Sequence, residues 1–426
     1  MAGGGPRIAV VGAGWAGLAA AVEVVRRGAT VTVFEMAPQP GGRARTIDSR
    51  GLLLDNGQHI CIGAYAETLR LMRDVGVAET DAFVRRPLTL VDAAGRGLRL
   101  RHGATVPAFA WAVLRRDGWR WRDRLALLAL AVRWQRTGFR CAAHCTVADL
   151  TEGLPPAVRA DFIEPLCVAA LNTPTADASG AVFLRVMQDA LTGGPGSADL
   201  LLPHLGLGAM LPDPAVAWLR ERGAAVGFAV RVERIERNDD GWAVNGMPFD
   251  CVVLAASANE SARLVAAQAP AWARRAEALD YQPIVTVYAR SDGCRLPEPM
   301  LSLHASDTRP AQFVFDRGQL GGPDGMLAFV VSGARTWLEH GTSAIEQAVL
   351  TQAAAELARL LPSPLEVARA VVEKRATFAC TPQIDRPSMV VAPGLFACGD
   401  YVAGPYPATL EGAVRSGLAA ANAAAA

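Results

Sequence analysis

Three glycines near the N-terminus have the spacing of a phosphate-binding turn. Gly12, Gly14 and Gly17 form a G-x-G-x-x-G pattern between an apolar, β-branched run at 8–11 and a stretch of helical character. Gly12 permits a tight turn, Gly14 lets the backbone approach a pyrophosphate, and Gly17 lets the helix and strand pack closely. The free N–H groups of the first helical turn attract the phosphates. The pattern therefore indicates a nucleotide cofactor.

An acidic residue follows this turn at the distance that a nucleotide-binding βαβ unit requires. Glu35 ends a second strand-like run at 30–34, 18 positions after Gly17, where its carboxylate can accept hydrogen bonds from a ribose diol. Strand, glycines, helix, strand and acid occur in order, which predicts dinucleotide binding. The pattern alone does not distinguish FAD from NAD.

A second glycine segment does distinguish the two cofactors. Gly42 and Arg43 belong to the sequence PQPGGRAR at 38–45, which resembles a segment of flavoenzymes related to amine oxidases and phytoene desaturases. The resemblance implies FAD with Arg43 at its phosphates, and a planar guanidinium can pair bidentately with phosphate. The alternative for Arg43 is a position in a solvated loop.

The stretch at 395–418 resembles the C-terminal FAD motif of the same superfamily. Asp400, at the end of a short apolar run, is placed to hold the ribityl chain, and a helix that begins near Thr409 offers free N–H groups to the flavin. The resemblance also implies that a backbone group near Val232 meets the adenine. The expected cofactor contacts are Gly12, Gly14, Trp15, Ala16, Gly17, Glu35, Gly42, Arg43, Gly57, Val232, Gly399, Asp400, Thr409 and Leu410.

These motifs imply an α/β fold, with a Rossmann-like FAD-binding domain of the glutathione-reductase-2 type and an inserted mixed-sheet and helical substrate domain. We expect a discontinuous FAD-binding domain formed by residues 1–80, 200–280 and 381–426. The substrate domain would comprise residues 81–199 and 281–380. The expected strands between the cofactor motifs are at 230–235, 250–255, 281–290, 312–315 and 326–332, with a turn at 239–241 and a helix at 343–361.

The composition excludes several classes of protein. The chain has 426 residues, 51% of them hydrophobic, and a formal net charge of +1. A disordered chain is excluded, and nucleic acid is not an expected partner because there is no basic excess. Cys141, His144 and Cys145 lack the second ligand pair that a zinc site needs, so we expect no metal. No signal peptide and no apolar run of bilayer length are found, which favours the cytoplasm.

One segment carries a local charge that the whole chain does not. Residues 111–136 hold seven arginines, two aspartates and four of the chain's nine tryptophans. Tryptophan is enriched at the headgroup level of a bilayer, and arginine can reach anionic phosphates. We expect the helical part at 104–140 to contact the inner face of the cytoplasmic membrane peripherally, through Trp111–Arg136. The alternative is a helical pair with a solvated charged face.

Motifs between the cofactor segments narrow the resemblance. They are DNGQH at 55–59, FIEPLC at 162–167, ALNTP at 170–174, LLLP at 200–203 and PATLEGAVRSG at 407–417, and they resemble the hydroxysqualene dehydroxylase family over essentially the whole chain. The resemblance implies an FAD-dependent oxidoreductase of hopanoid and triterpenoid biosynthesis that converts hydroxysqualene to squalene. Loss of the allylic hydroxyl as water would leave a cation, to which N5 of reduced FAD would deliver hydride. His204 departs from the pattern, because an arginine is expected there.

An acid must assist the departing hydroxyl, and the residues leave its identity open. His59 lies in the DNGQH segment, which is expected near the flavin, and can protonate near neutral pH. A structural histidine bonded to the backbone is an equally good interpretation of His59. Glu164 and Tyr401 are the other expected catalytic residues, and Asn172 is a further polar candidate.

Three other functions stay open at this point. A carotenoid or phytoene-type desaturase uses the same fold in the oxidising direction. An amine oxidase usually has an aromatic residue where this chain has Thr409, and a lysine on a strand near the flavin, whereas Lys374 is the only lysine in the chain. The third is a non-enzymatic flavin-binding or membrane-scaffold protein. No second G-x-G-x-x-G unit occurs, so the flavin needs an external electron donor of unassigned identity, and upstream enzymes of squalene synthesis are candidate partners.

Overall fold

The computed structural model describes residues 5–239 and 241–426. Residues 1–4 of the first expected FAD segment, and Asp240 of the expected turn at 239–241, lie outside the described residues.

Strand β1 (Arg7–Val11) lies near the middle of a six-stranded sheet and pairs in parallel with β2 and β14. Ile8 and Val10 pack into one hydrophobic core, and Ala9 and Val11 pack into another on the opposite face. The sheet order is β10 (Ala225–Gly227), β2 (Thr30–Phe34), β1, β14 (Cys251–Leu254), β21 (Leu395–Ala397) and β20 (Val390–Ala392). Only β20 runs antiparallel to its neighbour. This is the Rossmann-like α/β arrangement that the sequence predicts.

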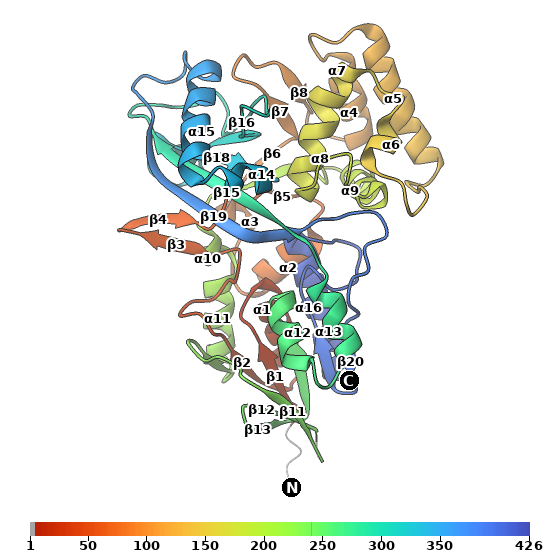
Figure 1. The fold of residues 1–426 in the computed structure, drawn as a ribbon, viewed down its shortest axis with the longest axis vertical. Helices are drawn as coiled ribbons and strands as arrows, with labels where there is room; N and C mark the ends of the chain where they lie inside the picture. The colour runs from red at the N-terminus through yellow and green to blue at the C-terminus, as the bar shows by residue number, and fades with distance from the viewer. Residues whose placement is uncertain (1–4, 240) are drawn as a thin grey trace.

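Helices pack on one face of this sheet and a small antiparallel sheet packs on the other, and together these elements form the Rossmann-like half of the molecule (Figure 1). α1 (Trp15–Arg26) packs against α16 (Leu410–Ala424) so closely that a Cβ at Gly417 would lie 2.1 Å from the Ala16 carbonyl oxygen. The other elements of this half are α2 (Ala66–Asp74), α3 (Glu79–Ala82), α10 (Leu207–Met210), α11 (Pro212–Glu221), α12 (Ala258–Val265), α13 (Pro270–Glu277), β11 (Ile235–Asn238), β12 (Gly241–Val244) and β13 (Met247–Phe249).

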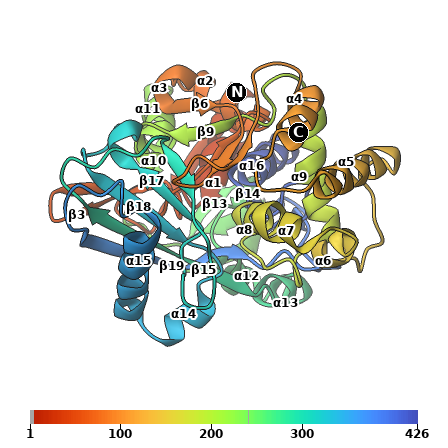
Figure 2. The same cartoon turned by 90° about the horizontal axis from the view of Figure 1, so that it is seen from above.

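A five-stranded antiparallel sheet forms part of the other half. Its order is β16 (Met300–Ser302), β17 (Phe313–Asp316), β18 (Met326–Val331), β15 (Tyr281–Arg290) and β19 (Glu366–Phe378). One face packs against α15 (Thr342–Glu356), beside which lies the short α14 (Arg335–Glu339) (Figure 2). A 3-10 turn, Arg317–Leu320, follows β17.

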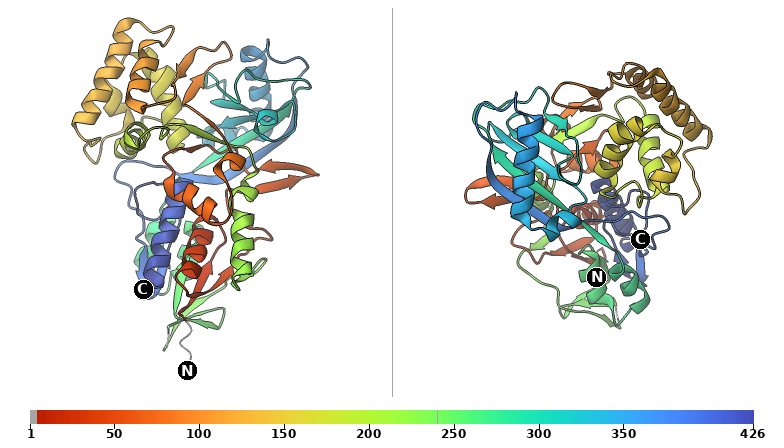
Figure 3. Two further views of the ribbon diagram at one scale, coloured as in Figure 1. Left: turned by 180° about the vertical axis from the view of Figure 1, so that it is seen from behind. Right: turned by 45° about the horizontal axis from the view of Figure 1, so that its top comes forward.

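A helical lobe at 105–192 lies beside this sheet, and Figure 3 shows the two from behind and with the top of the molecule tilted forward. Its elements are α4 (Thr105–Leu114), α5 (Trp121–Arg136), α6 (Val147–Thr151), α7 (Pro156–Val158), a π turn (Arg159–Ile163), α8 (Glu164–Leu171) and α9 (Gly180–Thr192). Small sheets link the parts: β3 (Thr46–Ser49) with β4 (Leu52–Asp55); β5 (Cys61–Ile62), β9 (Leu200–Pro203) and β6 (Phe83–Arg86); and β7 (Thr89–Val91) with β8 (Gly97–Arg99). None of the described helices is both long and apolar enough to cross a bilayer.

The six-stranded sheet gathers strands from three distant stretches, at 7–34, 225–254 and 390–397. We retain the domain boundaries given above as a proposal. The strand expected at 230–235 is wrong, because β11 begins only at Ile235. The preceding backbone instead bonds to the end of β2, with the Val230 N–H donating to the Glu35 carbonyl oxygen at 2.9 Å. Ala229 has φ of +55°, which interrupts extended geometry.

The tryptophans of 111–136 divide between core and surface. Trp119 and Trp134 are 5% and 3% exposed, and Trp119 Nε1 donates to Asp161 at 2.9 Å. Trp111 and Trp121 are 40% and 65% exposed. The expectation that all four contribute to a surface is therefore wrong for two of them, because Trp134 lies on the inner face of α5 and Trp119, in the loop before α5, packs into the same core.

Candidate functional site

A cavity of about 550 Å³ runs from the carboxyl ends of β1 and β2 into the space between the helical lobe and the five-stranded sheet. Ligands of doubly wound folds bind at this edge of the sheet. Every expected cofactor contact lines the cavity except Gly17. Gly17 lies behind the turn, where a Cβ would be 1.9 Å from the Gly12 carbonyl oxygen, so it serves the packing of helix on strand.

The start of α1 is built to receive an anion. Gly14 is its N-cap and supplies no side-chain cap, so the N–H groups of the first turn keep their hydrogen-bonding capacity. Glu35, 7% exposed, accepts hydrogen bonds from the N–H groups of Ala13 at 2.7 Å and Ala37 at 2.8 Å while lining the cavity. These bonds hold the carboxylate in place, and its remaining lone pairs can accept ribose hydroxyl groups.

Gly14 and Gly42 lie on the wall of the cavity and leave space beside them for an extended dinucleotide. Gly14 has an ordinary φ of −73°, and a Cβ added to it would meet nothing closer than the Gly42 Cα at 3.9 Å. The chain itself therefore does not require glycine at this position. Because Gly14 lines the cavity, a side chain there would occupy space that a cofactor backbone can use. The donor set and this space together fit the pyrophosphate of FAD.

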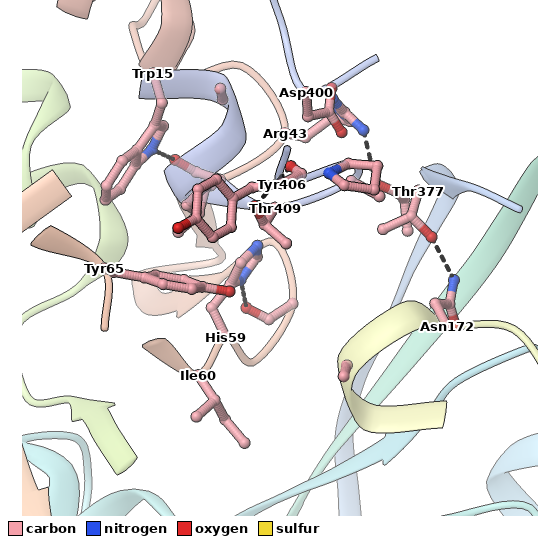
Figure 4. Close-up of a pocket in the computed structure, with 18 of the residues that line it drawn as sticks. Trp15, Arg43, His59, Ile60, Tyr65, Asn172, Thr377, Asp400, Tyr406 and Thr409 are labelled. Atoms are coloured by element: carbon pink, nitrogen blue, oxygen red, sulfur yellow. Dashed lines mark hydrogen bonds and ion pairs between the residues drawn. The ribbon is translucent and has the colours of Figure 1, made fainter. Parts of the chain in front are cut away.

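Arg43 joins the two halves of the molecule at the cavity wall (Figure 4). Its guanidinium forms an ion pair with Asp400 and donates to the Ala376 carbonyl oxygen of β19 at 2.7 Å. Burial acts to lower the pKa of Arg43, but Asp400, Tyr281 and Glu373 together raise it by more, so the pKa is raised. The ion pair and the bond to β19 hold Arg43 in place, which favours a fixed position over a solvated loop. Contact of Arg43 with the FAD phosphates stays a prediction.

The C-terminal motif brings a second helix start to the cavity. α16 begins at Leu410 with Thr409 as its N-cap, whose Oγ1 accepts from the Gly412 N–H at 2.9 Å. The Gly399 N–H donates to Ser416 Oγ at 2.8 Å, which fixes the end of β21 against α16. Val232, further along the cavity, uses its carbonyl to accept from Arg263 at 2.8 Å and has no partner for its N–H among the described residues.

His59 lies in the middle of the cavity, on the turn formed by Gly57. Its Nδ1 lies 2.9 Å from the Gly57 carbonyl oxygen, so this nitrogen carries the proton and Nε2 is free. Figure 4 shows the free edge of the ring directed toward Thr409. Burial lowers the pKa of His59 below its ordinary value, and nearby Arg43 adds to this. The resting imidazole is therefore neutral.

Of the two other expected catalytic residues, one lines the cavity and the other does not. Glu164 is exposed on α8 and does not line the cavity, although Phe162 and Leu166 beside it do. Tyr401 lines the cavity, but it is 1% exposed and its hydroxyl donates to Ser261 of α12 at 3.0 Å, inside the Rossmann-like half. Both assignments rested on residue type alone. The structure favours a structural role for Tyr401 and a surface position for Glu164.

The sequence does not predict the distant partners of two polar side chains at the cavity, Arg185 and Asn172. Arg185 of α9 donates to Tyr406 Oη at 2.8 Å and to Asp189 at 2.8 Å. Asn172 uses its whole amide, with Nδ2 donating to Thr377 Oγ1 at 2.9 Å and Oδ1 accepting from the Gly333 N–H at 2.7 Å. The i, i+4 spacing of Arg185 and Asp189 was the one available hint. Both ends of the Asn172 amide are therefore occupied within the protein, and a positioning role for Asn172 stays a prediction.

The far arm of the cavity is apolar. Its walls come from three parts of the fold, and they are Leu88, Leu90, Leu100, Phe109, Phe162, Leu166, Ile284, Met300 and Phe313. Such an arm suits a hydrocarbon chain, because burial of apolar surface supplies the binding free energy. Within the described ranges no group of three or more His, Cys, Asp or Glu residues is arranged to hold a metal ion.

The fold and this cavity together define the class of protein. A cofactor that lies extended over the Rossmann-like sheet would place its reactive end where that sheet meets the apolar arm. This is the arrangement of an FAD-dependent oxidoreductase with a separate substrate region.

Comparison with known proteins identifies the family. Residues 15–425 match the family described as flavin containing amine oxidoreductase, so the chain belongs to this family and FAD is its cofactor. The chain is 27% identical over 437 residues to a hydroxysqualene dehydroxylase of Sinorhizobium fredii, and 28% identical over 448 residues to one of Rhodopseudomonas palustris, with 97% of both chains covered in each case. Its fold is similar to that of cyclohexylamine oxidase from Brevibacterium oxydans, with a TM-score of 0.69 at 17% identity and 99% of both chains covered.

Proposed function

We propose that this protein removes the hydroxyl of hydroxysqualene reductively and releases squalene. The observation that carries the proposal is similarity over the full length to relatives named hydroxysqualene dehydroxylase, which includes the helical lobe and the five-stranded sheet as well as the FAD motifs. The apolar arm of the cavity gives a polyprenyl chain a place to bind next to the cofactor region. Lys374 lies at an exposed position of β19 and does not line the cavity, which disfavours amine oxidation.

Each part of the cavity has a distinct task in this reaction. When bound, reduced FAD supplies the hydride. The apolar arm binds the hydrocarbon chains and excludes water from the carbon that loses its hydroxyl. Arg43, Asp400 and the start of α16 hold the cofactor end of the cavity in a fixed position relative to the arm.

His59 is the residue that we propose to assist the departing hydroxyl. Its Nδ1–H is held by Gly57, so a second proton binds at Nε2, on the open edge of the ring. Transfer of that proton to the substrate oxygen releases water and returns the imidazole to its neutral resting state. Because the pKa of His59 is lowered, its protonated form gives up the proton readily, and only a small fraction of His59 is protonated at neutral pH.

The direct test is an anaerobic single turnover. Reduced, FAD-loaded protein is mixed with hydroxysqualene in detergent micelles, and squalene and flavin absorbance are followed together. We expect one squalene for each flavin reoxidised. No squalene would refute the proposal, and new conjugated double bonds formed from a phytoene-like polyene by the oxidised protein would favour a desaturase instead.

We further propose that the helical lobe contacts a membrane surface, from which an apolar substrate can enter directly. Six large apolar side chains of α4 and α5 are exposed and form what we call the α4–α5 face: Val106, Trp111, Leu114, Trp121, Leu125 and Val132. Arg115 and Arg122 lie against Trp111 and Trp121, with guanidinium carbons 4.6 and 5.5 Å from the ring centroids. Exposed tryptophan next to arginine is typical of an interfacial surface.

Flotation with vesicles tests the contact. The double variant Trp111→Ser, Trp121→Ser should lose binding to vesicles that contain phosphatidylglycerol. Trp218→Ser, on α11 of the Rossmann-like half, is the matched control and should bind like the wild type. Equal binding of all three proteins would rule out the α4–α5 face.

A further inference from the structure

A second, smaller cavity lies beside the apolar arm of the first. Its volume is about 300 Å³, and it lies between the end of β6, strands β7 and β8 and the loop before β16. The lining residues are Arg86, Pro87, Thr89, Arg99, Leu100, Arg101, His102 and Glu298. Three arginines therefore face one carboxylate, which leaves a net positive charge at this place on the surface.

The arginines keep hydrogen-bonding capacity for a ligand. Glu298 bridges Arg86 at 3.3 Å and Arg99 at 2.5 Å, and each of these contacts uses a single guanidinium nitrogen. Arg101 is exposed and forms no ion pair among the described residues. Each guanidinium has five N–H donors in a planar fork that matches the oxygens of a phosphate group. The cavity thus has the donors for a phosphate anion and only one competing carboxylate.

Two residues connect this cavity to features already described. Leu100 lines both cavities, so it separates the basic cavity from the apolar arm. Arg101 lies over the Trp111 ring, with its guanidinium carbon 5.0 Å from the ring centroid, which joins the basic cavity to the α4–α5 face. In Figures 1 and 3, β7, β8, α4 and α5 lie together at the end of the molecule opposite the N-terminus.

We propose that this basic cavity binds the phosphate of an anionic lipid headgroup. The inference deepens the proposed membrane contact and rests on it. The position of the site selects lipid over free phosphate, because a phosphate held beside Trp111 lies at the level where tryptophan meets headgroups. Binding there would hold the α4–α5 face on the bilayer with the apolar arm just behind Leu100. The lipid would position the protein and would not take part in the reaction.

The test uses vesicles of phosphatidylcholine with and without phosphatidylglycerol. Wild-type protein should bind only the anionic vesicles. Arg101→Gln should weaken binding about fivefold, and the double variant Arg99→Gln, Arg101→Gln more than about tenfold, since each arginine near an anionic surface contributes about 1 kcal/mol. The single variant breaks no ion pair, so its loss cannot come from an unpaired Glu298. The control Arg359→Gln, Arg369→Gln removes the same charge from exposed sites near α15 and on β19 and should change nothing.

Competition distinguishes the source of the phosphate. Millimolar inorganic diphosphate or glycerol phosphate should not release the protein from the vesicles if a lipid is the ligand. Release by either compound, or equal loss of binding in the Arg99→Gln, Arg101→Gln variant and its control, would overturn the proposal. The single-turnover assay in micelles contains no anionic lipid. A failure of the dehydroxylase proposal would therefore be seen in that assay, independently of vesicle binding.

Discussion

Gly14 and Gly17 are three positions apart and are glycine for different physical reasons. Gly14 faces the cavity with space around it, whereas a Cβ on Gly17 would overlap the Gly12 carbonyl oxygen. We predict that Gly14→Ala folds with a free energy of unfolding within about 1 kcal/mol of the wild type. The same variant should bind FAD at least about tenfold more weakly, a loss of about 1.4 kcal/mol. Flavin titration of the apoprotein measures this loss.

Gly17→Ala is the matched variant and should behave in the opposite way. Overpacking at this position should lower the free energy of unfolding by about 3 kcal/mol. Denaturant unfolding of the apoprotein measures the loss of stability separately from the loss of FAD binding, because no cofactor is present. Equal destabilisation of both apoproteins would contradict the distinction between cavity and packing.

The role of His59 predicts a definite pH dependence. The pKa of His59 lies below 6.5, so the fraction that carries a proton on Nε2 rises as pH falls through and below that value. The single-turnover rate should therefore increase on acidification and level off below the folded pKa. His59→Asn keeps a donor for the Gly57 carbonyl oxygen but cannot protonate, so its rate should be low and independent of pH. A wild-type rate that is flat from pH 5 to 8 would dismiss the acid role.

Acidification, which should raise the reaction rate through His59, should lower the contribution of His59 to the stability of the fold. The unfolded chain binds a proton at His59 below pH 6.5, whereas the folded chain keeps the ring neutral until a lower pH. The unfolded state therefore binds more protons in this window, and the contribution of His59 to stability is lost as pH falls. His59→Asn should reduce this acid sensitivity in thermal unfolding followed from pH 7 to 5.

Residue types predicted the cofactor end of the cavity better than its catalytic centre. Thr409 and Glu35 could be assigned because each is fixed by a neighbouring turn or helix start within its own motif. Glu164 was misassigned, since the sequence does not tell which side of α8 faces the cavity. The partners of Asn172 come from β15, β18 and β19, and no spacing along the chain encodes such contacts.

At the scale of elements, one buried side chain ties two helices together. Glu411, 0% exposed in the first turn of α16, accepts hydrogen bonds from the N–H groups of Glu67 at 3.1 Å and Thr68 at 2.9 Å, at the start of α2. It thereby caps a helix that begins more than 300 residues earlier in the chain. Thr68 Oγ1 and Arg415 also donate to the carboxylate.

We predict that Glu411→Gln lowers the free energy of unfolding by about 3 kcal/mol, because the amide nitrogen cannot accept and leaves buried donors without partners. Glu277→Gln, at an exposed position of α13, is the control and should differ from the wild type by less than about 0.5 kcal/mol. Thermal unfolding of the holoprotein measures both. A small effect of Glu411→Gln would show that the start of α2 finds other acceptors.

The elements that the sequence predicts well have an uninterrupted pattern. β2 and β15 were expected at their observed bounds, because both are continuous runs rich in β-branched and aromatic residues. The segment at 230–234 alternates, but it lies at the edge of the sheet and bonds to the chain after β2. In α5 both faces carry apolar residues, so periodicity does not reveal which tryptophans are buried.

At the scale of the whole molecule, the cofactor cavity is lined from all three stretches of the Rossmann-like half and from β19. FAD binding should therefore stabilise the fold as a unit. We predict that FAD at a hundredfold excess over its dissociation constant adds about 2.7 kcal/mol to the free energy of unfolding and raises the melting temperature by several degrees. Removal of the flavin should reverse the shift. A melting temperature independent of FAD concentration would contradict a cavity that binds the cofactor only in the folded state.

The contact of α1 with α16 has a consequence for the order of events during synthesis. The phosphate-binding turn leaves the ribosome first, yet the sheet beside it lacks β21 and the helix against it is missing until residues 395–424 have been made. Chain growth at about 5–20 residues per second leaves the apolar cavity walls incomplete for tens of seconds. Contacts of such large sequence separation also form slowly. We therefore expect FAD to bind only after α16 has docked, and the apolar cavity walls stay exposed to solvent until then.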